Sequence, residues 1–243
     1  MTDLAQFSPA PAMTPPAADE IHLWRVPLDP PAEKVAACRD LLSQDERQRA
    51  DRFHFDRHRR RFTVGRGVLR RLLGQYLDRA PRDIRFSYGP KDKPAAEDSG
   101  TLSFNLSNSH ELALIAVLQG PEVGVDLERL RPMPDAEDLA ERFFSRSERV
   151  ALRAVAAGSS KDRAFFRCWT RKEAYVKATG DGLSLPLDRF DVSLDEPRFL
   201  ALDGDPEIAR GWSLFHLEPG EGYLGALAVP GRRWRLRGWQ WAG

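Results

Sequence analysis

Two acidic residues alternate with apolar residues in the segment GVDLE, residues 124–128. In a β-strand, Asp126 and Glu128 would point to one side and Val125 and Leu127 to the other, because successive side chains alternate. Two carboxylates so placed lie about 7 Å apart and repel each other. A hard divalent cation such as Mg²⁺ would relieve that repulsion and keep positions open for substrate phosphate. The alternative is an ordinary exposed face of an antiparallel sheet.

A third carboxylate lies on a helix that we predict over residues 161–178. In the segment CWTRKEAYVK, Glu173 and Lys177 are four residues apart and are therefore neighbours on the helix surface. Lys172 instead projects into an apolar stripe that contains Trp169. Glu173 could complete a metal site with the two strand acids. The alternative is a surface Glu–Lys pair beside a lysine whose stem covers apolar surface.

The chain offers mainly oxygen ligands for a metal. It has two cysteines, Cys38 and Cys168, five histidines and no HExxH sequence, so a zinc site is not expected. Mg²⁺ usually takes one or two protein carboxylates and completes its shell with water and phosphate. Mn²⁺ accepts the same oxygen ligands, so the sequence does not choose between the two ions.

Basic residues concentrate early in the chain. Residues 46–71 hold ten arginines and three acidic residues, in a chain whose 37 Lys and Arg balance 36 Asp and Glu. These arginines fall on all sides of the predicted helices, so some of them face a neighbouring element or an anionic ligand. Downstream, Lys91 and Lys93 lie on a Gly- and Pro-rich turn, where they could contact phosphate or belong to an ordinary polar loop.

Polar side chains cluster where one predicted strand ends and the next begins. The segment FNLSNSH contains Asn105, Ser107, Asn108, Ser109 and His110. Such amides and hydroxyls can bind phosphate or ribose, and they can equally satisfy the backbone of the turn itself. His110 by itself indicates no catalytic role, because most single histidines are structural or exposed.

Composition argues against several protein classes. The near-zero net charge does not favour a nucleic-acid or membrane-surface binder, and the longest apolar run, residues 112–118, is too short to cross a bilayer. Two cysteines are too few for a disulfide framework, and no secretory signal is readable at the N-terminus, so we expect a cytoplasmic protein. Residues 1–19 are rich in Ala and Pro, and we expect a disordered leader there.

Strand-like and helical patterns alternate through the remaining chain. We expect strands at residues 21–28, 84–88, 102–106, 112–118, 123–128, 189–194, 212–217, 223–229 and 234–239, and helices at residues 32–42, 44–53, 57–79, 135–143, 146–157 and 161–178. The segments SQDER from Ser43 and SRSER from Ser145 each lead into a long basic helix, although S-x-x-E also arises independently as a capping box. We therefore predict an α+β fold of two similar lobes with pseudo-two-fold symmetry, residues 20–120 and 121–243, each a small antiparallel sheet packed with helices.

Together the motifs resemble those of one enzyme family. KDKP, FNLSNSH, GVDLE, RFFSRSE, WTRKEAYVKATGDGLSLP and LDRFDVSL occur in the order and spacing of the larger 4′-phosphopantetheinyl transferases, which activate peptide and polyketide synthetases. The resemblance covers roughly residues 43–194, and the pairing of GVDLE with W-x-x-K-E-A-x-x-K is its most specific part. It implies a monomer of two lobes that binds coenzyme A in the cleft between them.

The resemblance also implies roles for individual residues. The family's metal-binding acids correspond to Asp126, Glu128 and Glu173. Its contacts to phosphate and nucleotide correspond to Lys93, Ser107, Lys172, Lys177 and, loosely, the regions of Arg49 and Arg61, which would grip the 3′-phosphate.

One position departs from the family pattern. Many relatives carry histidine directly after the serine of the F-N-x-S motif, whereas this chain has Asn108 there and His110 two positions later. An amide can donate a hydrogen bond to a phosphate oxygen but cannot carry positive charge. The affinity for the 3′-phosphate, or its pH dependence, is therefore expected to differ, and the role of His110 stays open.

The implied reaction is attack by a serine hydroxyl of an apo acyl or peptidyl carrier protein on the β-phosphate of coenzyme A, with adenosine 3′,5′-bisphosphate as the leaving group. Mg²⁺ would bind the pyrophosphate, and Lys177 would add positive charge on the α-phosphate side. The serine proton could pass to Glu173 or to a water on the metal. Glu148 is a rival base, but it is also the N3 residue of a predicted capping box and so has a structural role.

Two other functions use the same features. A metal-dependent phosphohydrolase would use the three carboxylates on another phosphate ester, and a nucleic-acid-binding module would use the arginine-rich helix. For the transferase, we expect the carrier to dock near Phe143 and Phe144 with Arg142 and Arg146 beside them, because carrier proteins are typically acidic. The sequence does not indicate which carriers are preferred.

Overall fold

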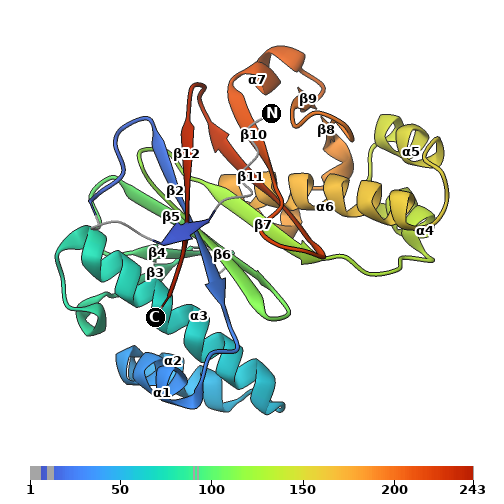
Figure 1. The fold of residues 1–243 in the computed structure, drawn as a ribbon. Helices are drawn as coiled ribbons and strands as arrows, with labels where there is room; N and C mark the ends of the chain where they lie inside the picture. The colour runs from blue at the N-terminus through green and yellow to red at the C-terminus, as the bar shows by residue number, and fades with distance from the viewer. Residues whose placement is uncertain (1–6, 10–13, 90, 92, 243) are drawn as a thin grey trace.

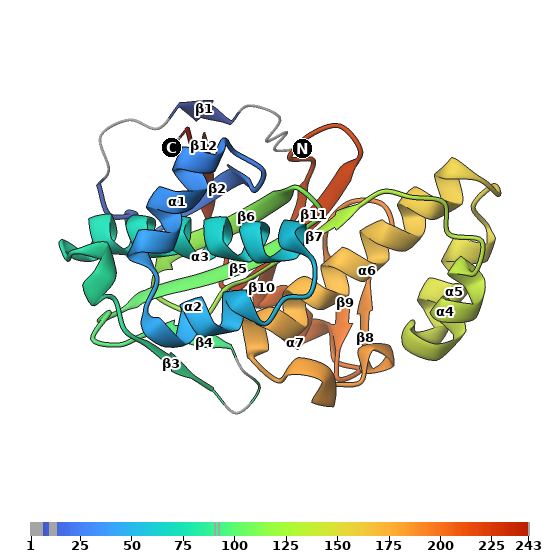
Figure 2. The same ribbon diagram turned by 90° about the horizontal axis from the view of Figure 1, so that it is seen from below.

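The computed structural model describes residues 7–9, 14–89, 91 and 93–242. Its elements form four layers in the order helix, sheet, sheet, helix, and the two sheets pack against each other in the middle (Figures 1 and 2). The long helices α3 (Asp56–Leu77) and α6 (Ser159–Thr179) form the outer layers. Among the described residues, no helix combines the length and the apolar composition that a bilayer crossing needs.

Among the described residues from Glu20 to Gln119, the first half of the chain contains three long strands, two short hairpin strands and three α-helices. In chain order its elements are β2 (Glu20–Pro27), α1 (Ala32–Leu41), α2 (Gln44–Asp51), α3, a short 3-10 helix (Pro81–Asp83), β3 (Phe86–Tyr88), β4 (Pro94–Ala96), β5 (Leu102–Ser109) and β6 (Leu112–Gln119). The strands β3 and β4 form a separate two-stranded hairpin.

The second half repeats this succession. In chain order its elements are β7 (Gly124–Arg129), α4 (Ala136–Phe143), α5 (Arg146–Arg153), α6, two 3-10 turns (Gly182–Ser184 and Leu187–Arg189), β8 (Phe190–Val192), β9 (Phe199–Leu202), α7 (Pro206–Arg210), β10 (Trp212–Leu217), β11 (Tyr223–Pro230) and β12 (Arg235–Gln240). The strands β8 and β9 form the second small hairpin.

The two main sheets have the same strand order over three strands. The larger sheet runs β1-β12-β2-β6-β5, where β1 is Ser8–Pro9, and the smaller sheet runs β10-β11-β7. In the larger sheet β2 pairs antiparallel with β6, which pairs antiparallel with β5. In the smaller sheet β7 likewise pairs antiparallel with β11, which pairs antiparallel with β10. The mixed helix and sheet composition with small antiparallel sheets therefore agrees with the sequence prediction.

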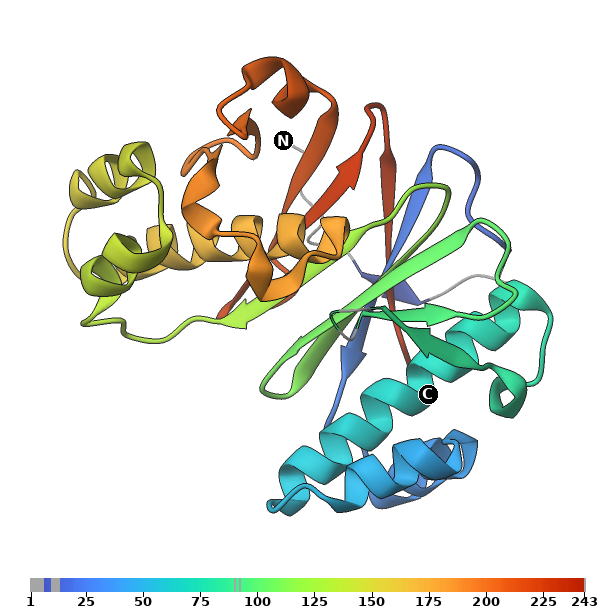
Figure 3. The same cartoon turned by 180° about the vertical axis from the view of Figure 1, so that it is seen from behind.

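Burial follows the layers. Strand β6, LALIAVLQ, is buried on both faces, because Ile115 and its alternate neighbours pack on α3 while Leu114 and its neighbours pack on the smaller sheet. A strand covered on both faces reads as a continuous apolar run, as this one does. In β7, Val125 and Leu127 point into the same space between the sheets. The other face of β7 therefore looks toward α6, which crosses it in Figure 3.

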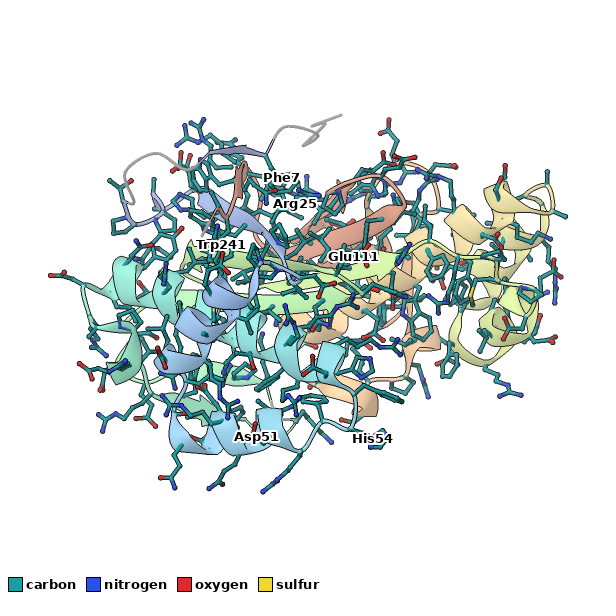
Figure 4. All side chains as sticks on the ribbon, turned by 60° about the horizontal axis from the view of Figure 1, so that its bottom comes forward. Phe7, Arg25, Asp51, His54, Glu111 and Trp241 are labelled. Atoms are coloured by element: carbon teal, nitrogen blue, oxygen red, sulfur yellow. The ribbon has the colours of Figure 1, made fainter. Side chains whose placement is uncertain are left out.

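Two predictions about the chain ends need correction. Strand β12, expected in the C-terminal lobe, pairs parallel with β2 and so belongs to the larger sheet of the first half. Within the expected disordered leader, Ser8–Pro9 pairs with β12, and Phe7 packs against the core between the sheets (Figure 4). Residues 1–6 and 10–13 of that leader lie outside the described residues.

Candidate active site

The acids of GVDLE lie on the face of β7 that looks toward α6. Asp126 is 5% exposed, while Val125 and Leu127 are buried on the opposite face, as the alternation predicted. Burial, and then the neighbouring Asp126 carboxylate, raise the pKa of Glu128. Burial, followed by Asp126 and Glu128, raises the pKa of Glu173. The three carboxylates are thus close enough to disfavour one another's charge.

A glycine allows helix and strand to approach. A Cβ atom on Gly124 would lie 2.0 Å from the carbonyl oxygen of Ala174 and 2.4 Å from the amide nitrogen of Ala178. Any larger residue would therefore push β7 away from α6. This contact brings Glu173 and Lys177, which flank the two alanines on α6, next to the acids of β7.

Lys177 joins the elements of the site. Its ammonium donates to Asp126 Oδ1 at 2.6 Å and to Ser107 Oγ at 2.9 Å. The Ser107 hydroxyl donates to the same Asp126 oxygen at 3.1 Å and accepts the amide of Leu127 at 3.2 Å. Helix α6, strand β5 and strand β7 therefore meet in one hydrogen-bonded cluster.

The donor set fits a hard divalent cation. Asp126 Oδ2 is buried and has no hydrogen-bond partner in the described part of the chain. Such an oxygen is costly unless a ligand contacts it, and mutually repelling carboxylates favour a cation between them. Across the described residues, however, no three or more His, Cys, Asp and Glu side chains already form a group that could hold a metal. The ammonium of Lys177 lies on the other oxygen of Asp126 instead.

Two cavities adjoin each other, one at the junction of the halves of the chain and one within the first half. The first, of about 230 Å³, is lined by Glu173 and Lys177 together with Lys91 and Lys93. The second, of about 220 Å³, is lined by Arg49, Arg61, Phe62, Arg66, Tyr88 and Asn108. Both include Pro94 and Leu106 in their walls. We call the two cavities together the groove; it runs from Glu173 and Lys177 to a group of arginines.

Comparison with known proteins gives the family. A family model described as the 4′-phosphopantetheinyl transferase superfamily matches residues 122–228, and one described as 4′-phosphopantetheinyl transferase, N-terminal, matches residues 27–119. The chain is 45% identical over 230 residues to the 4′-phosphopantetheinyl transferase HetI of Nostoc sp., a match of 92% of this chain and 93% of the relative. The chain belongs to the 4′-phosphopantetheinyl transferase superfamily.

More distant relatives agree with this membership. A phosphopantetheinyl transferase of Thraustochytrium sp. is 33% identical over 220 residues, which are 84% of this chain and 76% of the relative. The 4′-phosphopantetheinyl transferase Sfp of Bacillus subtilis is 32% identical over 156 residues, which are 64% of this chain and 68% of the relative. The resemblance that the motifs indicated is confirmed.

Lys172 does not belong to the site of this superfamily member. Its side chain is fully buried in the C-terminal half, where the ammonium lies 2.8 Å from Glu148 Oε1 and donates to the carbonyl oxygens of Leu187 and Phe190, both at 2.6 Å. The predicted contact of Lys172 with coenzyme A is therefore wrong. The helical pattern had placed this residue in the apolar stripe, and that part of the prediction is correct.

Glu148 has the structural role that its position predicted. Its carboxylate accepts the amide of Ser145 at 2.9 Å, in a capping box, and the amide of Val192 at 2.8 Å. It is 1% exposed and also pairs with Lys172. A carboxylate so enclosed cannot reach a substrate hydroxyl.

Lys93 lines the first cavity and also joins the halves of the chain. Its ammonium donates to the carbonyl oxygens of Lys177 at 2.6 Å and Val123 at 3.3 Å, and it lies 2.6 Å from Glu122 Oε2. The contact with Lys177 places positive charge at the C-terminal end of α6, where it is favourable. The contact of Lys93 with phosphate stays a prediction, in which a phosphate would compete with these three oxygens for the ammonium.

The arginines of the groove differ in their partners. Arg61 makes a bidentate contact to Asp29, with its closest N–O distance 2.6 Å. Arg49 lies over the ring of Phe62, 5.4 Å from its centroid, and has no ion-pair partner in the described part of the chain. Both line the second cavity, and Arg49 has the freer charge. Their contact with a 3′-phosphate stays a prediction.

Sequence reasoning missed two residues of the groove, Arg66 and Tyr88. The guanidinium of Arg66 lies 3.9 Å from the ring centroid of Phe86 and contacts the hydroxyl of Tyr88 and the carboxylate of Glu46. A signal was present, because Arg66 is one of the ten arginines of the basic segment. Periodicity could not separate it from its neighbours.

Asn108 lies on β5, whereas His110 lies in the turn that follows this strand. Asn108 is exposed and lines the arginine end of the groove. His110 sits in the turn with a positive φ of 53° and lines neither cavity. Burial, and then Arg129, lower its pKa. His110 therefore does not replace the family histidine in space.

Phe143 and Phe144 have different environments. Phe144 is 1% exposed and stacks on Phe165 within the core, so its predicted role in docking a carrier is wrong. Phe143 is 37% exposed and packs edge-on against Trp169. Only Phe143 can offer apolar surface to a partner.

Proposed function

We propose that the chain transfers the 4′-phosphopantetheine arm of coenzyme A to a serine of an apo acyl or peptidyl carrier protein and releases adenosine 3′,5′-bisphosphate. The observation that carries the proposal is a groove lined by Glu173 and Lys177 at one end and by Arg49, Arg61 and Arg66 at the other, with Asp126 and Glu128 next to Glu173. Coenzyme A has a diphosphate and a separate 3′-phosphate, and the two ends of the groove match these two anionic groups.

The arginine end binds the nucleotide. Guanidinium groups match phosphate in geometry and charge, and Arg49 is the one without a carboxylate partner among the described residues. Arg66 is held by Glu46 and by the aromatic rings of β3, so its position is fixed before ligand arrives. Asn108 donates an uncharged hydrogen bond to the 3′-phosphate.

The acidic end holds the diphosphate through Mg²⁺. Asp126, Glu128 and Glu173 would be its ligands, and the unpartnered Asp126 Oδ2 is the oxygen best placed to bind it. When bound, the ion supplies charge neutralisation for the diphosphate and the leaving phosphate.

The side chains of the chain itself orient the substrates and move the proton. Lys177, whose ammonium lies on Asp126 here, would contact the phosphate that departs with the nucleotide. Glu173 accepts the proton of the carrier serine, because its carboxylate lines the end of the groove at which the diphosphate would bind. Glu148 takes no part, since it is enclosed in its capping box.

The carrier docks beside the acidic end, at α4 and α5. Phe143 and the exposed Val150 supply apolar contact, and Arg142 and Arg146 face the acidic carrier surface. Helix α6 runs from these two helices toward its crossing with β7, and so links the proposed docking surface to the acidic end (Figure 1).

The two halves descend from one duplicated unit with pseudo-two-fold symmetry. Each has a buried capping-box glutamate paired with a buried cation on its long helix, Glu46 with Arg70 at 2.6 Å and Glu148 with Lys172 at 2.8 Å. Glu148 follows Glu46 by 102 residues, and Lys172 follows Arg70 by the same number. We further propose that the enzyme acts as a monomer in the reducing cytoplasm, which its two free cysteines fit.

The test is the mass of a carrier protein and the identity of the released nucleotide. Purified chain is incubated with coenzyme A, Mg²⁺ and an apo carrier, and the control carrier has its acceptor serine replaced by alanine. A mass gain of one phosphopantetheine arm on the first carrier only, with equal release of adenosine 3′,5′-bisphosphate, supports the proposal. Release of phosphate or nucleotide without carrier modification would indicate the phosphohydrolase. The nucleic-acid alternative has little support, since at least four arginines of the basic segment are paired with acids.

A further inference from the structure

The outer edge of β7 is satisfied by side chains instead of by another strand. Strand β7 ends the order β10-β11-β7, so its second edge has no hydrogen-bonded strand beside it. Its amides on that edge are nevertheless bonded to side chains of β5. The pairs are Val125 with Asn105 Oδ1, Leu127 with Ser107 Oγ and Arg129 with Ser109 Oγ, at N–O distances of 2.9, 3.2 and 3.1 Å.

These three pairs form a regular ladder. Each acceptor precedes its donor by 20 residues, and both strands advance two residues per step. Alternate side chains of a strand point the same way, and so do alternate amides, which is why three successive pairs can form. We call this set of six residues the side-chain ladder. It joins the edge of the larger sheet to the edge of the smaller one.

The two serines of the ladder also donate hydrogen bonds to the acids of β7. The Ser107 hydroxyl accepts the amide of Leu127 and donates to Asp126 Oδ1 at 3.1 Å. The Ser109 hydroxyl likewise accepts the amide of Arg129 and donates to Glu128 Oε2 at 3.2 Å. A hydroxyl has one hydrogen to donate, so accepting the backbone amide directs that hydrogen to the carboxylate.

We infer that Ser109 is a positioning residue for Glu128, and that the side-chain ladder fixes β7 and its acids relative to the first half of the chain. Ser109 is 9% exposed and lines neither cavity of the groove, so it acts through Glu128 and not on substrate. It lies two residues before Glu111, which Figure 4 shows where the two halves meet. The catalytic consequence rests on the proposed function, whereas the ladder itself does not.

Amide hydrogen exchange, measured by NMR on the full chain, tests the ladder. In Ser109→Ala we expect the amide of Arg129 to exchange about tenfold faster or more, because its acceptor is gone. Ser109→Thr keeps the hydroxyl and should retain slow exchange. The control is Ser103→Ala on the same strand, where the hydroxyl donates to the carbonyl of Gly120 and does not contact β7. Wild-type exchange at Arg129 in Ser109→Ala would overturn the ladder.

Metal binding tests the positioning role. Removing a group that orients a metal ligand typically costs about 10- to 100-fold in metal affinity. We therefore expect Ser109→Ala to raise the Mg²⁺ dissociation constant, measured by calorimetry in the presence of coenzyme A, and the Mg²⁺ concentration for half-maximal transfer, by about tenfold. Ser109→Thr should restore both values, and Ser109→Val, equal in size to Thr, should not.

The two measurements, amide exchange and Mg²⁺ binding, distinguish failure of the ladder from failure of the positioning role. Faster exchange at Arg129 with unchanged Mg²⁺ binding would overturn the positioning role and leave the ladder standing. A wild-type chain that modifies no carrier would refute the proposed function, and the exchange arm would still decide the ladder. If Ser109→Ala is too unstable to study, the Thr and Val pair carries both measurements.

Discussion

The ammonium of Lys177 on α6 lies 2.6 Å from Asp126 Oδ1 on β7, at the point where the two helix–sheet halves meet. Five residues earlier on the same helix, Lys172 is buried against Glu148 on the other side. One helix thus carries a lysine for the groove and a lysine for the core. Their different surroundings lead to different predictions for the same substitution.

Replacement of either lysine by methionine should separate activity from stability. Lys172→Met leaves the Glu148 carboxylate buried without its cation, which costs about 3–5 kcal/mol of unfolding free energy. Lys177→Met should cost less, because that side chain is 29% exposed, but should slow transfer by about 100-fold or more. Urea unfolding and initial transfer rates check both. Equal losses of stability in the two variants would contradict the assignment of Lys172 to the core and Lys177 to the groove.

Gly124→Ala should force β7 and α6 apart. The new Cβ would lie 2.0 Å from the carbonyl oxygen of Ala174, so backbone must move, and we expect a loss of about 1–3 kcal/mol together with slower transfer. Gly65→Ala on α3 is the matched control, because its Cβ would meet only Leu28 Cδ2 at 3.6 Å. Thermal unfolding of both variants is the measurement. A Gly124→Ala protein as stable as the wild type would show that the approach of strand and helix is looser than described.

His22 should make the fold sensitive to acid. Its ring is buried and accepts the hydroxyl hydrogen of Tyr76 at Nδ1, 2.8 Å away, while that hydroxyl accepts the indole N–H of Trp24. Burial lowers the pKa of His22 from 6.5 to about 4, whereas Glu20 acts in the opposite direction. Below pH 6.5 the unfolded chain therefore binds a proton that the folded chain does not. The stability is fully present above that pH and falls by about 3 kcal/mol toward pH 4.

Urea unfolding of wild type and His22→Gln at several pH values checks this contribution. The variant lacks the ionisable ring, so the difference between the two free energies of unfolding should change between pH 6.5 and pH 4 and stay constant above pH 7.5. A difference that does not vary with pH would mean that His22 is accessible to protons in the folded chain.

The sequence predicted the local elements closely because each half-buried element carries its own periodicity. The alternation in GVDLE put Asp126 and Glu128 on one face, and the structure has that face toward α6. Helical spacing likewise put Lys172 within an apolar stripe. The error came from extending the family's binding role to Lys172, since periodicity says which face a residue is on but not what covers that face.

Pairings between segments that are distant along the chain could not be predicted from the sequence. Strand β12 was predicted near its observed bounds, yet no local pattern indicates that it pairs parallel with β2. The ammonium of Lys93 reaches the end of α6, 84 residues away, and that contact depends on how the halves pack. The side-chain ladder is similar, because N-x-S-x-S is meaningful only once β7 is known to present an unpaired edge to β5.

Asn108→His should introduce a pH dependence into the binding of coenzyme A. A histidine at this exposed position is charged below about pH 6.5 and neutral above it, whereas asparagine is neutral throughout. We expect the variant to have a lower KM for coenzyme A at pH 6 than at pH 8, relative to the wild type. With dephospho-coenzyme A, which lacks the 3′-phosphate, that advantage should vanish. The same advantage with both substrates would place Asn108 away from the 3′-phosphate.

The most direct test of the central claim is the rate at which an apo carrier gains a phosphopantetheine arm, compared by intact mass between wild type and Glu173→Gln. The claim is that Glu173 acts with Asp126 and Glu128 on the diphosphate at the junction of β7 and α6. We predict one arm per carrier with the wild type, and a rate lower by about 100-fold or more in the folded variant. Equal rates in the two proteins, or no mass gain with the wild type, would contradict it.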